Sequence, residues 1–148
     1  MLLTEIFDKT VPWKWVTKPT PYVGRASFGV GDNKYVVTFE QDYMVVGVPT
    51  PDSGPTTQFL CRFRQTNTSK SKQFAITGAG HAFVVFGTVL EIIDAFKSAQ
   101  PQASIRLTAE EPSRVRLYSR LLPSRYPGTN IEREGKYTIY TLPPKQAK

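Results

Sequence analysis

The fold is decided by residues 74–142, which contain the glycine turn Thr77-Gly78-Ala79-Gly80. Residues 74–76 (Phe-Ala-Ile) predict a short strand before this turn, where glycine permits a tight change of direction. After the turn, apolar residues recur at steps of three and four and predict a helix over about residues 81–98: Ala82, Val85, Phe86, Val89, Ile92, Ile93 and Phe96. Further apolar residues lie off this stripe, so we expect the helix to be buried on more than one side: Phe83, Val84 and Leu90.

The rest of this stretch continues the alternation of strand and helix. Residues 104–109 predict a strand, and Glu110-Glu111-Pro112-Ser113 predicts the start of a second helix, because acidic residues and proline favour the first turn. We expect this helix to end at about Leu122, where Pro123 halts it. Residues 137–142 predict a closing strand, and residues 143–148 a frayed tail.

The first half of the chain predicts a short helix and then a meander. Residues 2–8 have apolar side chains at helical spacing, and Pro12 stops that helix. We expect Trp13 and Trp15 to pack where the helix meets the sheet, and the alternative is a peptide-binding surface beside the nearby prolines. Runs rich in β-forming residues predict about four antiparallel strands: residues 22–30, 35–40, 43–48 and 57–64, with a hairpin turn at 31–34 and a loop at 49–55. The predicted class is therefore α+β, with an antiparallel meander followed by β-α-β-α-β around a buried central helix.

Size and composition favour one domain over residues 1–148. A chain of this length buries roughly 70% of the surface that its unfolded form exposes. The lone Cys61 excludes an internal disulfide and a cysteine-based zinc site. The first residues lack the pattern of a signal peptide, and the longest apolar run, residues 82–93, is shorter than the ~20 residues that span a bilayer. We expect a cytoplasmic protein that does not bind membranes.

Basic residues outnumber acidic ones by nineteen to twelve and give a net charge of +7. Two stretches carry basic residues without acids: Arg62, Arg64, Lys70 and Lys72 in the first, and Arg114, Arg116, Arg120 and Arg125 in the second. Such clusters attract phosphate or an acidic partner, and they equally serve as a solvated face that keeps a protein soluble. In the strand at 57–64, Phe59, Cys61 and Phe63 alternate with Arg62 and Arg64, so rings and charges fall on opposite faces. This arrangement disfavours the stacking platforms of single-strand binders.

The glycine turn is the strongest candidate for a ligand site. Backbone amides at a helix start point at negative charge, and glycines let the backbone approach it, so Gly78, Ala79, Gly80 and His81 could hold a phosphate or pyrophosphate. The turn lacks the ending of a Walker loop and the third glycine of the dinucleotide fingerprint. The alternative is a plain strand-to-helix turn. No metal site is expected, because Glu110-Glu111 is explained by the helix dipole.

The order of these elements resembles the Gcn5-related N-acetyltransferases (GNAT family) over most of the chain. In that family an Arg/Gln-x-x-Gly-x-Gly/Ala turn holds the pyrophosphate of acetyl-coenzyme A, and a tyrosine in the later helix protonates the leaving thiolate. The resemblance implies Gly78 and Gly80 for the turn, Tyr118 for the acid and acetyl-CoA as the cofactor. Ala75 departs from the pattern, because it stands where the family has Arg or Gln. Glu40 is the one plausible strand carboxylate for a base.

A narrower resemblance covers about residues 74–122. Ile76-Thr77-Gly78-Ala79-Gly80-His81-Ala82, Leu107-Thr108-Ala109-Glu110-Glu111-Pro112-Ser113-Arg114 and Leu117-Tyr118 look like segments of small proteins of unassigned function from tailed bacteriophages. This resemblance implies an accessory phage protein in the host cytoplasm or the virion, which acts by binding a virion subunit or a host protein. An acetyl-CoA-dependent N-acetyltransferase is the alternative, and a non-specific nucleic-acid binder using the arginine clusters is the third.

Overall fold

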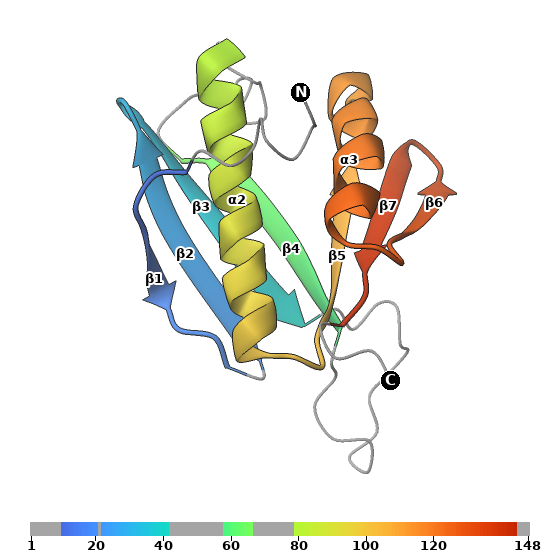
Figure 1. The fold of residues 1–148 in the computed structure, drawn as a ribbon, viewed down its shortest axis with the longest axis horizontal. Coiled ribbons are helices and arrows are strands. Elements are labelled where there is room, and N and C mark those ends of the chain that lie inside the picture. The colour runs from blue at the N-terminus through green and yellow to red at the C-terminus, as the bar shows by residue number, and fades with distance from the viewer. Residues whose placement is uncertain (1–9, 21, 42–57, 67–78, 145–148) are drawn as a thin grey trace.

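The computed structural model describes residues 10–20, 22–41, 58–66 and 79–144, which form a seven-stranded sheet and two helices (Figure 1). The expected helix at 2–8, strands at 43–48 and 74–76, loop at 49–55 and most of the expected tail lie outside the described residues. The elements are β1 (Trp13–Thr17), β2 (Val23–Val30), β3 (Asn33–Gln41), β4 (Gln58–Gln65), α2 (Ala79–Ala99), β5 (Ser104–Ala109), α3 (Pro112–Arg125), β6 (Asn130–Glu134) and β7 (Tyr137–Leu142).

The sheet is mixed, with the strand order β1-β2-β3-β4-β5-β7-β6. All neighbouring strands pair antiparallel except β4 and β5, which are parallel. A parallel pair requires a crossover connection, and α2 lies in the segment between these two strands. The predicted α+β class is therefore confirmed.

The predicted hairpin is confirmed between β2 and β3. Val30 pairs with Asn33, which leaves Gly31 and Asp32 as the connecting residues. Gly31 has a φ of 61°, in the left-handed region that glycine adopts without a steric penalty. This turn sets the register of β2 and β3, whose alternate residues Ala26, Val37 and Phe39 are fully buried.

Both described helices pack on the same face of the sheet (Figure 1). From α2, the ring of Phe96 stacks on Phe39 of β3 with centroids 4.1 Å apart and meets Phe59 of β4 at 4.9 Å. From α3, the carbonyl oxygen of Val115 accepts a hydrogen bond of 3.0 Å from the hydroxyl of Tyr140 on β7. Residues 85–90 of α2 are all buried, as predicted for the central helix. We call the opposite side of the sheet the outer face.

Two edge strands were not predicted from the sequence, and the predicted end of α3 was wrong. The segment with Trp13 and Trp15 is a strand, β1, whose two tryptophans pack against the core. β6 was not predicted because all five of its residues are exposed, so it lacks an alternation of apolar and polar positions. Pro123 does not halt α3, which continues to Arg125. Within its last turn the proline removes one backbone hydrogen bond, and the adjacent Leu121 and Leu122 are buried.

A polar clamp joins the C-terminal halves of α2 and α3. The carboxylate of Asp94 accepts a hydrogen bond of 2.6 Å from the guanidinium of Arg125 and one of 2.7 Å from the hydroxyl of Tyr126. Next to it, the ammonium of the buried Lys97 lies 5.0 Å from the centre of the Tyr126 ring and donates to the carbonyl of Pro143. These contacts fix α3 against α2 and hold the chain after β7.

Replacement of Gly24 tests the packing of α2 on the sheet. A Cβ atom at Gly24 would lie 2.9 Å from the Phe96 ring, whose contacts with Phe39 and Phe59 leave it little room to move. We expect Gly24→Ala to lower the free energy of unfolding by about 1–3 kcal/mol in urea titrations. Gly29→Ala on the same strand is the matched control, because its nearest neighbour would be 3.5 Å away. Equal losses in the two variants would contradict this packing.

Replacement of Asp94 tests the clamp. We expect Asp94→Ala to lower the free energy of unfolding by about 1–2 kcal/mol, because two hydrogen bonds to a partly exposed carboxylate are lost. Glu91→Ala, at an exposed position one turn earlier on α2, should change it by less than about 0.5 kcal/mol. Chemical denaturation of both variants measures the difference, and a loss of similar size in Glu91→Ala would exclude a specific clamp.

Candidate binding site on the outer face

The outer face is built from the alternate, outward-pointing residues of the strands. Because side chains alternate along a strand, residues paired across the sheet share a face. One cross-strand row contains Arg25 of β2, Thr38 of β3 and Arg62 of β4. The next row runs from Glu40 through Leu60 and Arg106 to Thr141, and so crosses the sheet from β3 to β7: Glu40↔Leu60, Leu60↔Arg106 and Arg106↔Thr141.

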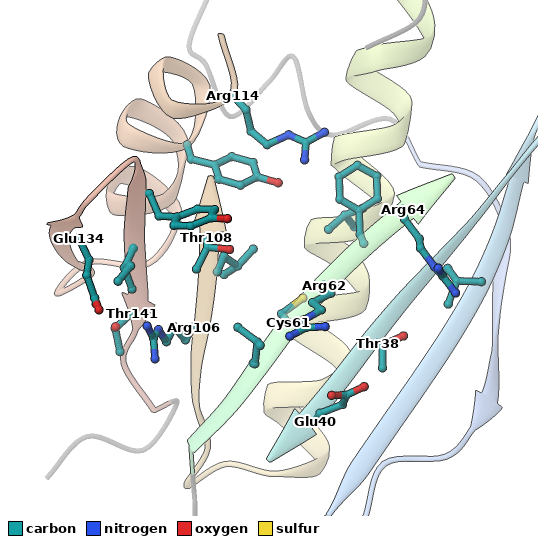
Figure 2. A pocket seen from close by; sticks show the side chains of 18 of the residues that line it. Thr38, Glu40, Cys61, Arg62, Arg64, Arg106, Thr108, Arg114, Glu134 and Thr141 are labelled. Carbon is teal, nitrogen blue, oxygen red and sulfur yellow. The ribbon is translucent and has the colours of Figure 1, made fainter. Parts of the chain in front are cut away.

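The sheet opens at its centre, because β4 and β5 separate soon after they meet. Their pairing ends with Leu60 and Arg106, although β4 continues to Gln65 and β5 to Ala109. Figure 1 and Figure 2 show the two strands diverging from this point. A cavity of about 1030 Å³ occupies the opening and spreads over the outer face on both sides of it (Figure 2).

Charged side chains dominate the two walls of this cavity. The first wall, formed by β2, β3 and β4, carries Arg25, Arg62 and Arg64 together with Glu40. The second wall, formed by β5, β7 and β6, carries Glu132 and Glu134 beside Tyr137, Thr108 and Thr141. Arg106 lies where the walls meet. The first wall is therefore basic and the outer edge of the second wall is acidic.

At depth the cavity ends on aromatic and aliphatic side chains from the helical side. Val89 of α2 and Tyr118 of α3 line it between the strands. Phe63 of β4 packs edge-on against Phe86 of α2 at 5.6 Å, and Phe86 packs in the same way against Tyr118 at 6.0 Å. The guanidinium of Arg114 lies 5.3 Å from the centre of the Phe63 ring. These side chains fill the space between α2 and α3 behind the opening of the sheet.

Tyr118 and Cys61 are both held in their neutral forms. Burial raises the pKa of the Cys61 thiol well above its ordinary value. Burial also raises the pKa of the Tyr118 phenol, against the opposing effect of the positive charge on Arg114. Neither group supplies an anion at neutral pH, so a role for Cys61 as a nucleophile is disfavoured, whereas a neutral phenol can donate a proton.

The glycine turn is only partly described. Gly78 lies outside the described residues, and Ala79, Gly80 and His81 form the first turn of α2. The helix thus begins two residues earlier than the predicted position at His81. Tyr118, which the family resemblance pairs with this turn, lines the cavity between β4 and β5.

The predicted basic surface is divided among three places. Arg62, Arg64 and Arg114 line the cavity. Arg116 and Arg120 are exposed on α3, and they do not line the cavity. Arg125 is bound to Asp94 in the clamp.

Five charged residues of the cavity were not predicted as part of the basic surface: Arg25, Glu40, Arg106, Glu132 and Glu134. Each of these residues either has neutral neighbours in the sequence or lies on a strand whose partner strands cannot be read from the sequence. A detectable signal existed for Arg25 and Arg106, because each occupies an outward position in an alternating strand. Only the strand order brings them to the same cavity.

Two further classes of site, a metal centre and a membrane-spanning helix, concern the residues that the structure describes. In this part of the chain, no three histidine, cysteine or acidic side chains lie close enough together to hold a metal ion. Neither α2 nor α3 combines the length and the apolar character that a helix needs to cross a membrane.

The buried thiol and phenol predict a loss of stability in alkali. In the unfolded chain Cys61 and Tyr118 ionise near their ordinary pKa values of 9.0 and 10.0, whereas the folded protein keeps both protons. Stability is therefore complete below about pH 9 and falls above it, by about 1.4 kcal/mol per pH unit for each such group. Urea titrations from pH 8 to 10 measure this fall. In Cys61→Ala the free energy of unfolding should start lower and decline less between pH 9 and 10. An unchanged decline would contradict the assignment.

In comparisons with known proteins, no family model matches the chain, and no curated protein and no solved structure is significantly similar to it. The function is therefore inferred from the residues and the geometry of this protein.

Proposed function

We propose that this protein is a binding protein that holds a partner protein on the outer face of its sheet, on a scaffold of the GNAT type. The observation that carries this proposal is the charged cavity of about 1030 Å³ between β4 and β5 and over the neighbouring strands. Eight of the twenty residues that line it are charged: Arg25, Glu40, Arg62, Arg64, Arg106, Arg114, Glu132 and Glu134. Pockets for small molecules are mostly apolar, whereas charged residues give an interface specificity and fast association.

The scaffold assignment is supported by the arrangement of the second half of the chain. A single parallel pair at the centre of an antiparallel sheet, a helix between its two strands and a later helix carrying Leu117-Tyr118 agree with the family resemblance. An acetyltransferase needs a gap for a pantetheine arm, which the resemblance implies between the strand before Gly78 and the strand from Ser104. The first of these strands lies outside the described residues, and the divergence of β4 from β5 gives an opening of the same kind beside β5. The resemblance to tailed-bacteriophage proteins supports an accessory role in the host cytoplasm or the virion.

An acetyl-CoA-dependent N-acetyltransferase is the second candidate. Tyr118 favours it by position, because this residue lines the opening of the sheet, but burial raises the pKa of its phenol and so makes it a weaker proton donor. Phe63, Phe86 and Arg114 weigh against it, since they fill the space behind the opening. Ala75 also departs from the pyrophosphate-binding pattern.

Non-specific binding of nucleic acid is the third candidate and the least favoured. The basic wall alone suits phosphate, but Glu132 and Glu134 line the same cavity and repel a polyanion laid across it. Arg116 and Arg120 on α3 are exposed away from the cavity and do not complete a continuous basic surface with Arg62 and Arg64.

Photocrosslinking tests where a partner binds. A benzophenone amino acid at position 38, between Arg25 and Arg62 on the outer face, should give one discrete adduct in the cells that naturally make the protein. The same group at position 116, exposed on α3, is the matched control and should not form that adduct. The adduct is detected by its mass on denaturing gels. Formation of the same adduct from both positions, or from neither, would contradict binding on the outer face.

Calorimetry with acetyl-CoA separates binding from catalysis. We expect no binding at micromolar concentrations, because side chains occupy the space between α2 and α3. Micromolar binding that is lost in Gly80→Arg, within the first turn of α2, would instead overturn the proposal that the protein acts by binding a partner alone. Tyr118→Phe would then be assayed for the loss of turnover.

A further inference from the structure

We infer that the cavity recognises a peptide segment of mixed charge, with its acidic side chains against β2–β4 and its basic side chains against β6. This inference rests on the proposed function and names the chemistry of the partner. It depends on the separation of the two kinds of charge within the cavity. The basic group is Arg25, Arg62 and Arg64, with Glu40 as the acidic residue on the same wall, and the acidic group is Glu132 and Glu134.

The three arginines form a compact basic group. Arg25 and Arg62 both pair across the sheet with Thr38, so roughly 10 Å separates their backbones. Arg64 follows two residues after Arg62 on the same face of β4, about 7 Å further along the strand. All three are exposed, and none has a carboxylate within 4 Å among the described residues. A guanidinium binds a carboxylate through two parallel hydrogen bonds, so this group suits several acidic side chains together.

The two glutamates form the opposite charge group on the last strand. Glu132 and Glu134 are alternate residues of β6, so both side chains point to the outer face. Both are exposed, and the side-chain amide of Asn130 donates a hydrogen bond of 2.6 Å to the carboxylate of Glu132. Lysine or arginine side chains of a bound segment would complete this wall. β5 and β7 separate the two groups, because β6 is three strands away from β4 in the sheet.

The separation of charge favours a polypeptide over a nucleic acid. A nucleic-acid strand carries negative charge at every phosphate, so the part of it that crossed towards β6 would meet Glu132 and Glu134. A polypeptide can carry acidic residues in one part and basic residues in another. Juxtaposed like charges cost several kcal/mol in an interface, so the acidic wall selects against a uniformly anionic partner.

Fluorescence anisotropy with synthetic probes tests this inference. The main probe is a labelled block peptide with about four glutamates, a Gly/Ser spacer and about four lysines. The comparison probes are peptides that keep only one charged block and a single-stranded oligothymidylate. At about 0.15 M salt we expect the block peptide to bind at least about fivefold more tightly than each comparison probe. Tighter binding of the oligothymidylate would overturn the inference in favour of nucleic acid.

Two double variants of equal charge change locate the basic wall. We expect Arg62→Glu with Arg64→Glu to weaken binding of the block peptide about tenfold. Arg116→Glu with Arg120→Glu changes the net charge by the same amount on the exposed side of α3, and should change affinity less than about twofold. Equal effects of the two pairs would show that net charge alone governs binding and would overturn the inference. Thermal melts verify that all four substitutions leave the fold intact.

A third double variant tests the acidic wall. Glu132→Lys with Glu134→Lys should weaken binding of the block peptide about fivefold and strengthen binding of the oligothymidylate. Stronger binding of both probes would contradict a role for the glutamates in contacting basic residues. The crosslinking adduct at position 38 reports where the partner binds and not which charges hold it. If the adduct still forms in both double variants of the cavity, the partner binds on the outer face, but the proposed charges do not hold it there.

Discussion

The contact between Phe96 and the rings of Phe39 and Phe59 determines how the sheet is covered. β4 and β5 are parallel, so the chain must cross between them on one side of the sheet. The packing of these three rings determines on which side of the sheet α2 lies. Gly24 has no side chain and so leaves the space that the Phe96 ring occupies. α3 packs on the same side through Tyr140. The polar side chains that alternate along the strands therefore remain on the outer face.

The opening at the centre of the sheet follows from the same arrangement and gives the site its depth. Once β4 and β5 separate beyond Leu60 and Arg106, side chains from α2 and α3 close the space behind them. The result is a cavity with an apolar floor at Val89 and Tyr118 and charged walls. A bound segment would therefore be read mainly by its charge along the walls, with room for an apolar side chain at the centre.

Local patterns predicted much of the fold, whereas the site depended on strand pairing. The hairpin at Gly31, the long apolar helix and the start of α3 each have a strong signal within a few residues. β6 lacked such a signal because it is exposed on both faces. The end of α3 was placed too early, because Pro123 was expected to stop the helix, whereas the helix continues past it and buries Leu121 and Leu122. Arg62 and Arg64 were predicted as an exposed pair. Their proximity to Arg25, and the acidic residues across the opening, follow from a strand order that no single segment encodes.

Only three residue pairs join β4 to β5, whereas β3 and β4 share seven. The sheet is thus two smaller sheets connected by a short seam, with α2 on the first and α3 against β5 and β7. Across the seam the two units share one hydrophobic core, and ring contacts such as Phe86 with Tyr118 and the clamp at Asp94 join them further. The free energy that holds the two units together therefore comes mainly from burial of this shared core and less from strand pairing. A partner seated across the seam would contact strands of both units and would act as a bridge between them.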